Sequence, residues 1–517
     1  MSMTWLANAD FETAWAHQAW TDFRDLPHKD DYLAVLPVFG IADHGLGQPM
    51  DAEELVGSEI LHRATLHAKD AVKLRVLPPL RFVLAPYPNT LFGIDPETAH
   101  DLIRDVARSV QAAGFKKLVF WVTSPWNEEL IDAASRDTRA ELNLQTFVVN
   151  LSGLGLNFHP ASDSRAQLQA AVSALTGVAA DISTAPPGEA TDPNFRPGRW
   201  RQPSPVTPDA SLDGGAILAT AGHHLATLLT EIDARAPLGS RTGRPLAALP
   251  SEPAPRHAES APVWPGAYRG RYLPAMSRAQ LNALPAKADA LVLLPTGAIE
   301  QHGHHLPVGV DSILGQAWLN GALPLLPANA PVYVAPPIMF AKSNEHVGFP
   351  GTVYTSAKVL RRLLLALVHQ LHALGFRRFA TLNTHGGNSA VLIYTIRELQ
   401  EALDIRIGAI GSGFRPPLSP QENEYGFHAG HWETALMLAA ATPTVRMDRA
   451  VCEFPARLDD PGELRPENAP AIFSWISSDI SASGVMGDAT LATEADGQAW
   501  FAAACANLAT RLTEQLT

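Results

Sequence analysis

The chain carries two copies of one sequence pattern, and this duplication restricts its fold more than any other feature. The segment LAVLPVFGIADHG (33–45) resembles LVLLPTGAIEQHG (291–303), which lies 258 positions later. Three further matches follow in the same order at slowly changing offsets: VLPPLRFVLAP (76–86) with YVAPPIMFAKS (333–343), AGFKKLVFWVTSPWN (113–127) with LGFRRFATLNTHGGN (374–388), and GGAILAT (214–220) with GDATLAT (487–493). Because 517 residues also exceed the size of one ordinary domain, we expect two domains of the same fold.

A stretch rich in proline, serine, alanine and glycine separates the two copies. It contains APLGSRTGRP and SEPAPRHAESAP, a composition that cannot bury a core and is typical of a linker. We therefore predict a first domain at 1–233, a linker at 234–264 and a second domain at 265–517.

Short aliphatic runs alternate with amphipathic stretches in each half. Four runs of the second half have the composition of buried parallel strands: ALVLLP (290–295), VYVAPPI (332–338), FRRFATLN (376–383) and IRIGAIG (405–411). The stretches at 356–375 and 388–403 place apolar residues three and four positions apart, which indicates helices, and Gly375 is a helix stop. The sequence therefore predicts two tandem α/β domains with mainly parallel sheets flanked by helices.

Charge and cysteine content narrow the classes of partner and compartment. The formal net charge is −13 and no run of basic residues offsets it, which argues against a nucleic-acid or anionic-membrane partner. No apolar run approaches the ~20 residues of a membrane-spanning helix, and the first residues lack the pattern of a signal peptide. Two cysteines, Cys452 and Cys505, make no disulfide framework, so we expect two buried thiols and a cytoplasmic protein.

Carboxylate and imidazole side chains follow four predicted strands of the second half. Because ligands bind beyond the carboxyl ends of parallel strands, we expect these side chains to gather at one edge of the sheet. The candidates are Glu300, His302 and Asp311 after 290–295, Ser343, Glu345 and His346 after 332–338, His385 after 376–383, and His428 and Glu433 after 405–411. Any one of them alone would ordinarily be a solvated loop residue, but their joint arrival at one edge favours a functional site.

The donor types of this cluster suit divalent metal ions such as Zn²⁺, Mn²⁺ or Fe²⁺. Glu300 and His302 lie two positions apart, so in an extended segment both side chains can face one site. The two oxygens of Asp311 could bridge a pair of ions about 3.5–4 Å apart, the spacing usual in paired-metal hydrolases. A serine hydrolase is the weaker alternative, because THGGN (384–388) is similar to an oxyanion loop but the chain has no GxSxG nucleophile elbow.

The run PTGAIEQHGHHLPVGVD (295–311) resembles the signature of the creatininase (creatinine amidohydrolase) family. SNEHVGFPGT, NTHGGN, FHAGHWETALM and GDATLAT follow in the order of that family, and the resemblance covers roughly 268–516. It implies two creatininase-like domains in tandem and two divalent metal ions per chain, bound by Glu300, His302, Asp311, His385 and Glu433, with Asp311 bridging. It also implies that His428 and Glu433 are catalytic and that substrate is bound by Ser343, Glu345, His346, Gly386 and Tyr425.

The chain departs from true creatininases at two places. Those enzymes have Tyr and Glu after the ligand histidine, where this chain has Gly386 and Gly387, and a Trp-Asp pair where it has Glu424 and Tyr425. The missing Glu makes Glu433 the candidate fifth ligand, and both changes argue against creatinine itself as substrate. Relatives without those residues include a formamide hydrolase of flavin and deazaflavin biosynthesis and a peptidase that trims the precursor of a ribosomally made redox cofactor.

The first copy lacks most of the candidate site. The substitutions are Ala42 for Glu300, Ser124 for His385, Pro125–Trp126 for Gly386–Gly387 and, if His159 matches His428, Ser164 for Glu433. Only His44, with Asp51 as a candidate, remains of the first ligand motif, so we predict a metal-free pseudo-domain. Because creatininase-family proteins assemble into hexamers, the resemblance implies a homo-oligomer, such as a trimer of two-domain chains. This copy would then replace a neighbouring subunit and shape or cover the active site.

The expected activity is metal-dependent hydrolysis of a carbon–nitrogen bond, other than a peptide bond, in a small cyclic or linear amide. The ions would lower the pKa of a water molecule and polarise the carbonyl, and His428 would return a proton to the leaving nitrogen. Formamide hydrolysis and precursor-peptide cleavage are alternatives within the family. A non-catalytic metal-binding scaffold is the alternative of another class: the degenerate first copy favours it, and the intact second ligand set argues against it.

Overall fold

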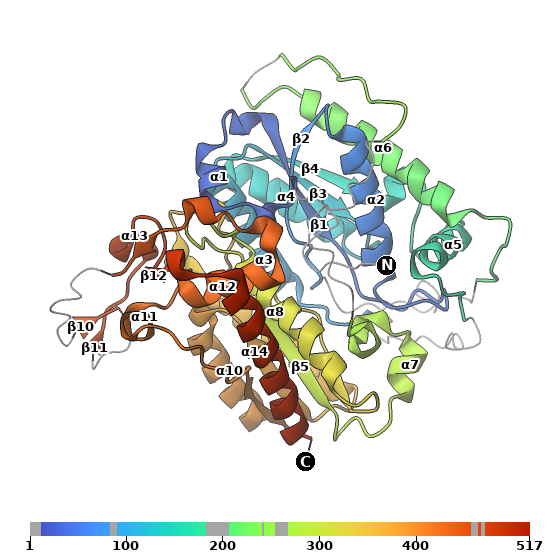
Figure 1. Ribbon diagram of the computed structural model, residues 1–517. Coiled ribbons are helices and arrows are strands. Elements are labelled where there is room, and N and C mark those ends of the chain that lie inside the picture. Colours follow the sequence, from blue (N-terminus) through green and yellow to red (C-terminus); the bar gives the residue numbers. More distant parts are fainter. Residues whose placement is uncertain are drawn as a thin grey trace.

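The duplication appears directly in the sheets of the computed structural model, which describes residues 12–82, 90–181, 206–239, 242–253, 267–455, 464–466 and 471–516. Each half contains a four-stranded, all-parallel sheet, and the two sheets have the same strand order. Figure 1 labels the strands of the first sheet, β1 to β4, and β5 of the second. The first sheet runs β2 (Lys73–Val76), β1 (Tyr32–Val38), β3 (Lys117–Val122), β4 (Gln145–Asn150), and the second runs β6 (Val332–Val334), β5 (Leu291–Thr296), β7 (Arg378–Asn383), β8 (Arg406–Ile410). The predicted pair of α/β units with parallel sheets is confirmed.

Equivalent residues of the sequence repeat occupy equivalent positions in the two central strands of each sheet. Leu33 pairs with Lys117 in the first sheet, and Leu291 pairs with Arg378 in the second, so the repeat offsets of 258 and 261 hold in the strand register. The four strands predicted for the second half are all present, with bounds that differ by a few residues at their ends. Residues 83–86 of one repeat segment lie outside the described residues.

The fourth repeat match is wrong as a structural alignment. GGAILAT forms the first turns of α6 (Gly214–Ala234), whereas GDATLAT forms β12 (Gly487–Asp488) and a 3-10 helix (Ala489–Leu491). Both segments begin a helical turn under an aspartate cap: Asp213 accepts from the Ala216 amide, and Asp488 from the Thr490 amide. The shared acid and small residues therefore reflect a common cap rather than equivalent positions.

Helices cover both faces of the first sheet. The outer layer is α2 (Ala52–Ala68), α5 (Arg165–Thr176) and α6, and the other face carries α3 (Pro96–Ala112) and α4 (Glu128–Leu142). Alternate strand residues separate the two faces, because successive side chains of a strand point in opposite directions. Leu33 and Val35 pack in the cluster with α2, whereas Ala34 and Leu36 belong to the cluster shared with the second half.

The second half repeats these layers. The helices α8 (Val310–Ala322), α12 (His431–Ala440) and α14 (Glu494–Glu514) pack together, and α9 (Ala357–Ala373) packs with α10 (Ser389–Ala402). Ser356 caps α9 by accepting a hydrogen bond from the Val359 amide, and Gly375, with φ +103°, follows its end as predicted. Helices α9 and α10 match the two helices that the sequence predicted for this half.

One hydrophobic core joins the halves. Helix α3 packs against α9, and a single buried cluster contains strand residues of both sheets together with Trp15 and Phe23. The segment that precedes the first sheet, with α1 (Trp20–Asp25), lies against loops of the second half: Trp15 Nε1 donates to the Gly351 carbonyl at 2.8 Å. The first copy is therefore packed onto the second.

Short elements complete the second half. They are α7 (Arg278–Ala283), α11 (Pro420–Tyr425), α13 (Ser477–Ile480), the antiparallel pair β9 (Cys452–Glu453) and β12, and the pair β10 (Leu464–Arg465) and β11 (Ala471–Ile472). Both thiols are free, and Cys505 is buried as predicted. Cys452 is exposed, which corrects the prediction of two buried thiols, because it lies on the two-residue strand β9 outside both main sheets.

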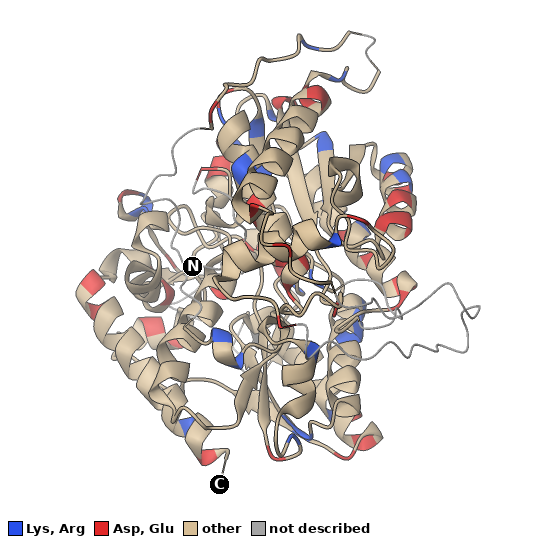
Figure 2. Cartoon of the chain, turned by 90° about the vertical axis from the view of Figure 1, so that its right-hand side faces the viewer, with Lys and Arg blue, Asp and Glu red and all other residues tan. Residues whose placement is uncertain are grey.

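Residues 242–253 of the predicted linker contain no helix or strand, and residues 240–241 and 254–264 lie outside the described part. Helix α6 ends at Ala234, one residue beyond the predicted end of the first domain. Within the described residues, none of the helices combines the length and apolar composition needed to cross a bilayer. In the view of Figure 2, Lys and Arg lie scattered among Asp and Glu, in keeping with the absence of a basic run from the sequence.

Candidate metal centre

The predicted donor residues meet where the strands of the second sheet end. Glu300 and His302 follow β5, His385 follows β7, and Asp311 is the second residue of α8. Glu345 and His346 lie in a 3-10 helix (Asn344–His346) after β6, and His428 and Glu433 lie at the start of α12, beyond β8. Parallel strands direct all four connections to one edge, so the sequence expectation of convergence holds in the structure.

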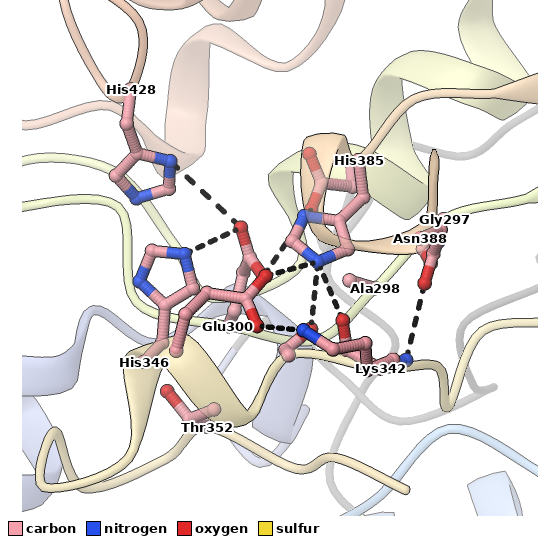
Figure 3. Close-up of polar contacts among 12 residues, drawn as sticks. Gly297, Ala298, Glu300, Lys342, His346, Thr352, His385, Asn388 and His428 are labelled. Carbon is pink, nitrogen blue, oxygen red and sulfur yellow. Dashed lines mark hydrogen bonds and ion pairs between the residues drawn. The ribbon is translucent and has the colours of Figure 1, made fainter. Parts of the chain in front are cut away.

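The Glu300 carboxylate lies at the centre of the cluster and is buried. Three imidazoles point toward it from separate segments (Figure 3). Its Oε2 lies 3.1 Å from His385 Nδ1, and its Oε1 lies 3.3 Å from His346 Nε2 and 3.8 Å from His428 Nδ1. One carboxylate therefore joins residues that are far apart in the sequence.

His302 joins a second set of carboxylates to this centre. Its Nε2 lies 3.6 Å from Asp311 Oδ1, 3.8 Å from Glu433 Oε2 and 4.0 Å from Glu300 Oε1. Asp311 Oδ2 lies 3.7 Å from His385 Nδ1, so the two oxygens of Asp311 face two different histidines. This is the arrangement that a bridging carboxylate requires.

Several buried atoms of the cluster make no hydrogen bond to any residue that the structure describes. They are Glu300 Oε2, His302 Nε2 and Asp311 Oδ2. Such atoms carry a free-energy cost unless another group satisfies them, and a metal ion does so for oxygen and imidazole nitrogen donors. Donor atoms that lie within 4.8 Å of one another form four groups: Glu300–His302–Asp311, His302–His428–Glu433, Glu300–His346–His428 and Glu300–Glu345–His385. The residues present therefore fit divalent metal ions.

Outer hydrogen bonds fix which ring nitrogen faces the centre. His302 Nδ1 lies 3.1 Å from the Glu300 carbonyl oxygen, which can only accept, so this nitrogen carries a hydrogen, and Nε2 is the atom that presents a lone pair once the ring is neutral. His428 Nε2 donates in the same way to the Gln301 carbonyl at 2.7 Å, which leaves Nδ1 as the bare nitrogen toward Glu300. Both rings are oriented as metal-binding histidines usually are.

Gln301 is a buried member of the site that the sequence reasoning missed. Its Nε2 lies 3.0 Å from His346 Nδ1, from His428 Nε2 and from the Gly484 carbonyl oxygen. Since the Gln301 amide is a donor to His346 Nδ1, the neutral His346 ring carries its hydrogen on Nε2 and donates toward Glu300. The signal for Gln301 is its place between Glu300 and His302, where strand-like alternation turns its side chain to the opposite side.

Glu345 contacts the outer side of His385, a candidate metal ligand. Glu345 Oε1 lies 3.2 Å from His385 Nε2, and its Oε2 accepts from Lys342 Nζ at 2.7 Å. His385 Nε2 also donates to the Lys342 carbonyl at 2.8 Å, which leaves Nδ1 toward Glu300 and Asp311. A Cβ at Gly387 would collide with Glu345 Oε1. The carboxylate therefore fills the space into which a side chain at 387 would project.

Burial and neighbouring charges set the protonation of the cluster. Burial raises the pKa of Glu300 to about 7, against the opposing effect of His385. Burial also acts to lower the pKa of His302, but the carboxylates, Asp311 foremost, raise it to about 9. The pKa of His385 lies well above its usual value because Glu300 and Glu345 outweigh burial. Burial lowers the pKa of His428 well below its usual value, so that ring is neutral near pH 7.

A cavity of about 360 Å³ opens beside the cluster. His428 and Glu433 reach it from the cluster, and Phe414, Phe427 and Trp432 supply aromatic walls. Its lining does not include Ser343, Glu345, His346, Gly386 or Tyr425, the residues predicted to bind substrate. Of these, Ser343 is buried with Oγ 3.3 Å from His385 Nε2, Gly386 opens a 3-10 helix, and Tyr425 ends α11. Their assignment to substrate stays a prediction.

The first half keeps one histidine–carboxylate pair in the corresponding place. His44 Nε2 lies 3.0 Å from Glu53 Oε1, and Glu53 Oε2 accepts from the Gly40 amide at 2.6 Å. At the repeat offset of 258, Glu53 corresponds to Asp311, and each is the second residue of its helix. Asp51, the candidate named from the sequence, is instead bound by Arg269, with Nη1 and Oδ2 3.0 Å apart.

A phenylalanine takes the place of the histidine ring in this half. Phe158 stacks on His44 with ring centroids 4.5 Å apart, as His428 stacks on His302 at 4.3 Å. Phe158, rather than the neighbouring His159 suggested by the sequence, is thus the spatial counterpart of His428. His159 stacks on Trp126 instead. A ring without nitrogen cannot move a proton or bind a metal ion.

Comparison with known proteins identifies relatives of both halves. The creatininase family model, described as creatinine amidohydrolase, matches residues 16–182 and 274–512. These two segments cover more than three quarters of the chain and agree with the tandem arrangement predicted from the repeats.

Individual relatives match about half of the chain. A mycofactocin precursor peptide peptidase from Mycolicibacterium smegmatis is 33% identical over 214 residues, covering 41% of this chain and 80% of the relative. A creatinine amidohydrolase from Pseudomonas putida is 29% identical over 214 residues, covering 37% and 81%. A crystal structure of creatinine amidohydrolase (creatininase) is 23% identical, covers 48% of this chain and 98% of that chain, and has a TM-score of 0.40.

Proposed function

The chain belongs to the creatininase family, and on that premise we propose that its second half is a metal-dependent hydrolase of carbon–nitrogen bonds in small amides. The observation that carries the proposal is a buried cluster in which Glu300 Oε2, His302 Nε2 and Asp311 Oδ2 make no hydrogen bond within the described residues, together with His385 and Glu433. A cluster of this composition is costly to bury unless it holds cations. We assign the binding of two divalent ions to these five residues.

Divalent ions bound by these five residues, called the metal cage below, would supply Lewis acidity and lower the pKa of a water molecule toward neutrality. The chain supplies what holds and orients them. Asp311 turns one oxygen toward His302 and the other toward His385, so it is the bridging ligand of the proposal. Glu433, whose Oε2 accepts from the Ala429 amide and lies 3.8 Å from His302 Nε2, takes the part of the fifth ligand.

His428 is the proton-transferring residue of the proposal. It lines the cavity, and its bare Nδ1 faces the Glu300 carboxylate at 3.8 Å. Because burial keeps the ring neutral near pH 7, Nδ1 is ready to accept a proton and then pass it to a leaving nitrogen. A neutral ring must accept a proton before it can donate one, so the accepting step comes first.

The substrate is a molecule that fits the aromatic cavity beside His428. Phe414, Phe427 and Trp432 offer flat apolar surfaces, and Asn423 and Arg415 add polar groups. A precursor-peptide substrate is the second candidate, favoured by the 33% identical relative named as a peptidase. Turnover of small cyclic amides, formamides and short peptides by metal-loaded protein separates these candidates. A protein that binds two ions but hydrolyses none of them would be the metal-binding scaffold.

Removal and return of metal tests the proposal. We expect a chelator to abolish hydrolysis, and Mn²⁺ or Zn²⁺ to restore it, with two ions per chain by elemental analysis. Glu300→Gln and His385→Ala should lose activity while their far-ultraviolet circular dichroism stays unchanged. His44→Ala, the matched change in the first half, should keep the rate within about three-fold, because Phe158 and Glu53 surround His44 with no counterpart of Glu300. Full turnover by thoroughly metal-stripped protein would refute the proposal.

A further inference from the structure

The two halves bind each other through equivalent backbone contacts. A short segment precedes each sheet, residues 16–18 in the first half and 274–276 in the second, and is called a strip here. Each strip accepts two amide hydrogen bonds from the loop before the first long helix of the other half. The four bonds are Val308 N to Gln18 O (2.8 Å), Gly309 N to Ala16 O (2.9 Å), Met50 N to Met276 O (3.0 Å) and Asp51 N to Pro274 O (2.9 Å). Every residue of one pair is 258 positions from its equivalent in the other pair, so the contact is reciprocal.

Reciprocal contacts of this kind are the property of a two-fold symmetric dimer. Arg81 marks the pseudo-axis, because its Nη1 contacts Sδ of Met339, the residue 258 positions later. Helices α3 and α9, which are equivalent in the two copies, also pack on each other. The chain therefore encloses within itself an interface that two separate copies would form.

Helix α1, which follows the strip of the first half, extends this contact toward the metal cage. Trp20 Nε1 donates to the Ser483 carbonyl at 3.0 Å, in a buried bond between residues 463 positions apart. Its ring packs edge-on against Phe349 and lies 5.3 Å from the His304 ring. Asp22 forms ion pairs with Arg446 and Arg449, and the Arg446 amide donates to the His305 carbonyl. Helix α1 thus contacts loops on several sides of the cage.

A short path leads from Trp20 to the proton-transferring histidine. The residue after Ser483 is Gly484, whose carbonyl accepts from Gln301 Nε2 at 3.0 Å. The Gln301 side chain fits so closely that a Cβ on Gly484 would collide with it. Two residues further on, Met486 exchanges both backbone hydrogen bonds with His428. Fixing the backbone at 483 therefore fixes both the Gln301 amide and the backbone of His428.

We propose that Trp20 of the degenerate first half is a positioning residue for the catalytic centre of the second half. The first copy serves as a built-in partner subunit, and its Trp20 holds the 483–486 loop so that Gln301 and His428 keep their places. This inference rests on the proposed function only where turnover is the measurement.

Trp20→Phe is the sharpest variant, because it keeps a ring against Phe349 but cannot donate to the Ser483 carbonyl. Trp121→Phe is its matched control: Trp121 Nε1 donates to the Gly57 carbonyl at 2.9 Å, equally buried but inside the first half. Hydrogen–deuterium exchange needs no substrate. We expect segments 481–487 and 300–305 to exchange about five-fold faster in Trp20→Phe, the size of one ordinary hydrogen bond, and unchanged in Trp121→Phe. Equal exchange of these segments in both variants would overturn the proposal.

Kinetics then distinguish positioning from simple stability. For any substrate that the wild type turns over, kcat of Trp20→Phe should fall about five-fold with KM and metal content unchanged, while Trp121→Phe loses thermal stability without loss of kcat. Unchanged kcat in Trp20→Phe, with faster exchange, would reduce Trp20 to a structural contact. If the metal-loaded wild type hydrolyses nothing, the proposed function fails, and the exchange result still decides whether Trp20 holds the loop.

Discussion

At the scale of single residues, the space around His385 matters because position 387 has no side chain. Glu345 can therefore lie beside His385 and hold it among the candidate metal ligands. Glu345 and the Lys342 carbonyl hold the outer nitrogen of the His385 ring, and Lys342 Nζ neutralises Glu345. Carboxylates in this position fix the tautomer and orientation of metal-binding histidines. The absence of a side chain at Gly387 is what leaves room for this carboxylate.

Gly387→Ala should therefore disturb the cage, although it adds a single methyl group. The Cβ would collide with Glu345 Oε1 and with His385 Nε2 and so break the contact between them, and loss of such a partner typically weakens metal binding about 10- to 100-fold. Titration of the metal-free protein with Zn²⁺ in the presence of a competing chelator measures the change. Gly386→Ala is the control, since a Cβ there meets open space and should leave the metal affinity as it is. Equal metal affinity in both variants would contradict the role of Glu345.

Metal binding should also release protons, because the donors hold them tightly when no cation is bound. The pKa of His302 is raised to about 9 and that of His385 well above its usual value, so both rings carry an extra proton at pH 7. Glu300, with a pKa of about 7, is then half protonated. Calorimetric titration in buffers of different ionisation enthalpy should show release of about two protons or slightly more. Since affinity rises with pH where protons must leave, and Glu300 is also protonated below pH 7, the affinity should change up to about a thousand-fold per pH unit there. Release of no protons would mean that other groups hold the metal.

At the scale of elements, periodicity and the repeat predicted most of what the structure contains. The strands at 291–296 and 378–383 and the helices at 357–373 and 389–402 follow from local apolar patterns, which tertiary packing reinforces. GDATLAT was wrongly matched with GGAILAT because an aspartate cap followed by small residues recurs wherever a helical turn begins. Gln301 was missed, and Glu345 was assigned to substrate rather than to His385, because their partners Gly484 and His385 come from segments far away in the sequence and no local pattern encodes such contacts.

Equivalent helix positions give a matched pair of variants at this scale. Asp311 and Glu53 are the second residues of α8 and α2, but Asp311 has an unpartnered oxygen whereas Glu53 binds His44 and the Gly40 amide. Asp311→Ala should abolish metal binding and activity. Glu53→Ala should keep two ions per chain and lower the free energy of unfolding by about 2–4 kcal/mol, because the Gly40 amide, His44 and Thr123 lose their buried acceptor. Denaturant unfolding and elemental analysis of the two proteins measure both effects. Loss of metal from Glu53→Ala would show that the first half has a metal-binding role.

At the scale of the whole molecule, the two copies pack directly on each other around a shared core. Their cores merge through α3 and α9, and each half completes its backbone hydrogen bonds on the other. The first copy has Ala42 and Ser124 in place of Glu300 and His385 but keeps the interface, which is the part that a partner subunit needs to retain. A homo-oligomer, for which we expect three chains, would then use faces other than the one enclosed here.

The second half should consequently depend on the first even when the linker is cut. Residues 265–517 expressed alone would expose the apolar surface that covers Trp15 and Phe23 and would leave the amides of Val308 and Gly309 without acceptors. We expect this fragment to aggregate or to pair with itself, and co-expression with residues 1–233 to return a soluble complex that co-purifies through a tag on either part. Size-exclusion chromatography of the two preparations makes the comparison. A Trp20→Phe version of the first fragment should still assemble, because the four reciprocal backbone bonds and the shared core remain. A stable, monomeric second half on its own would show that the fused interface is dispensable for folding.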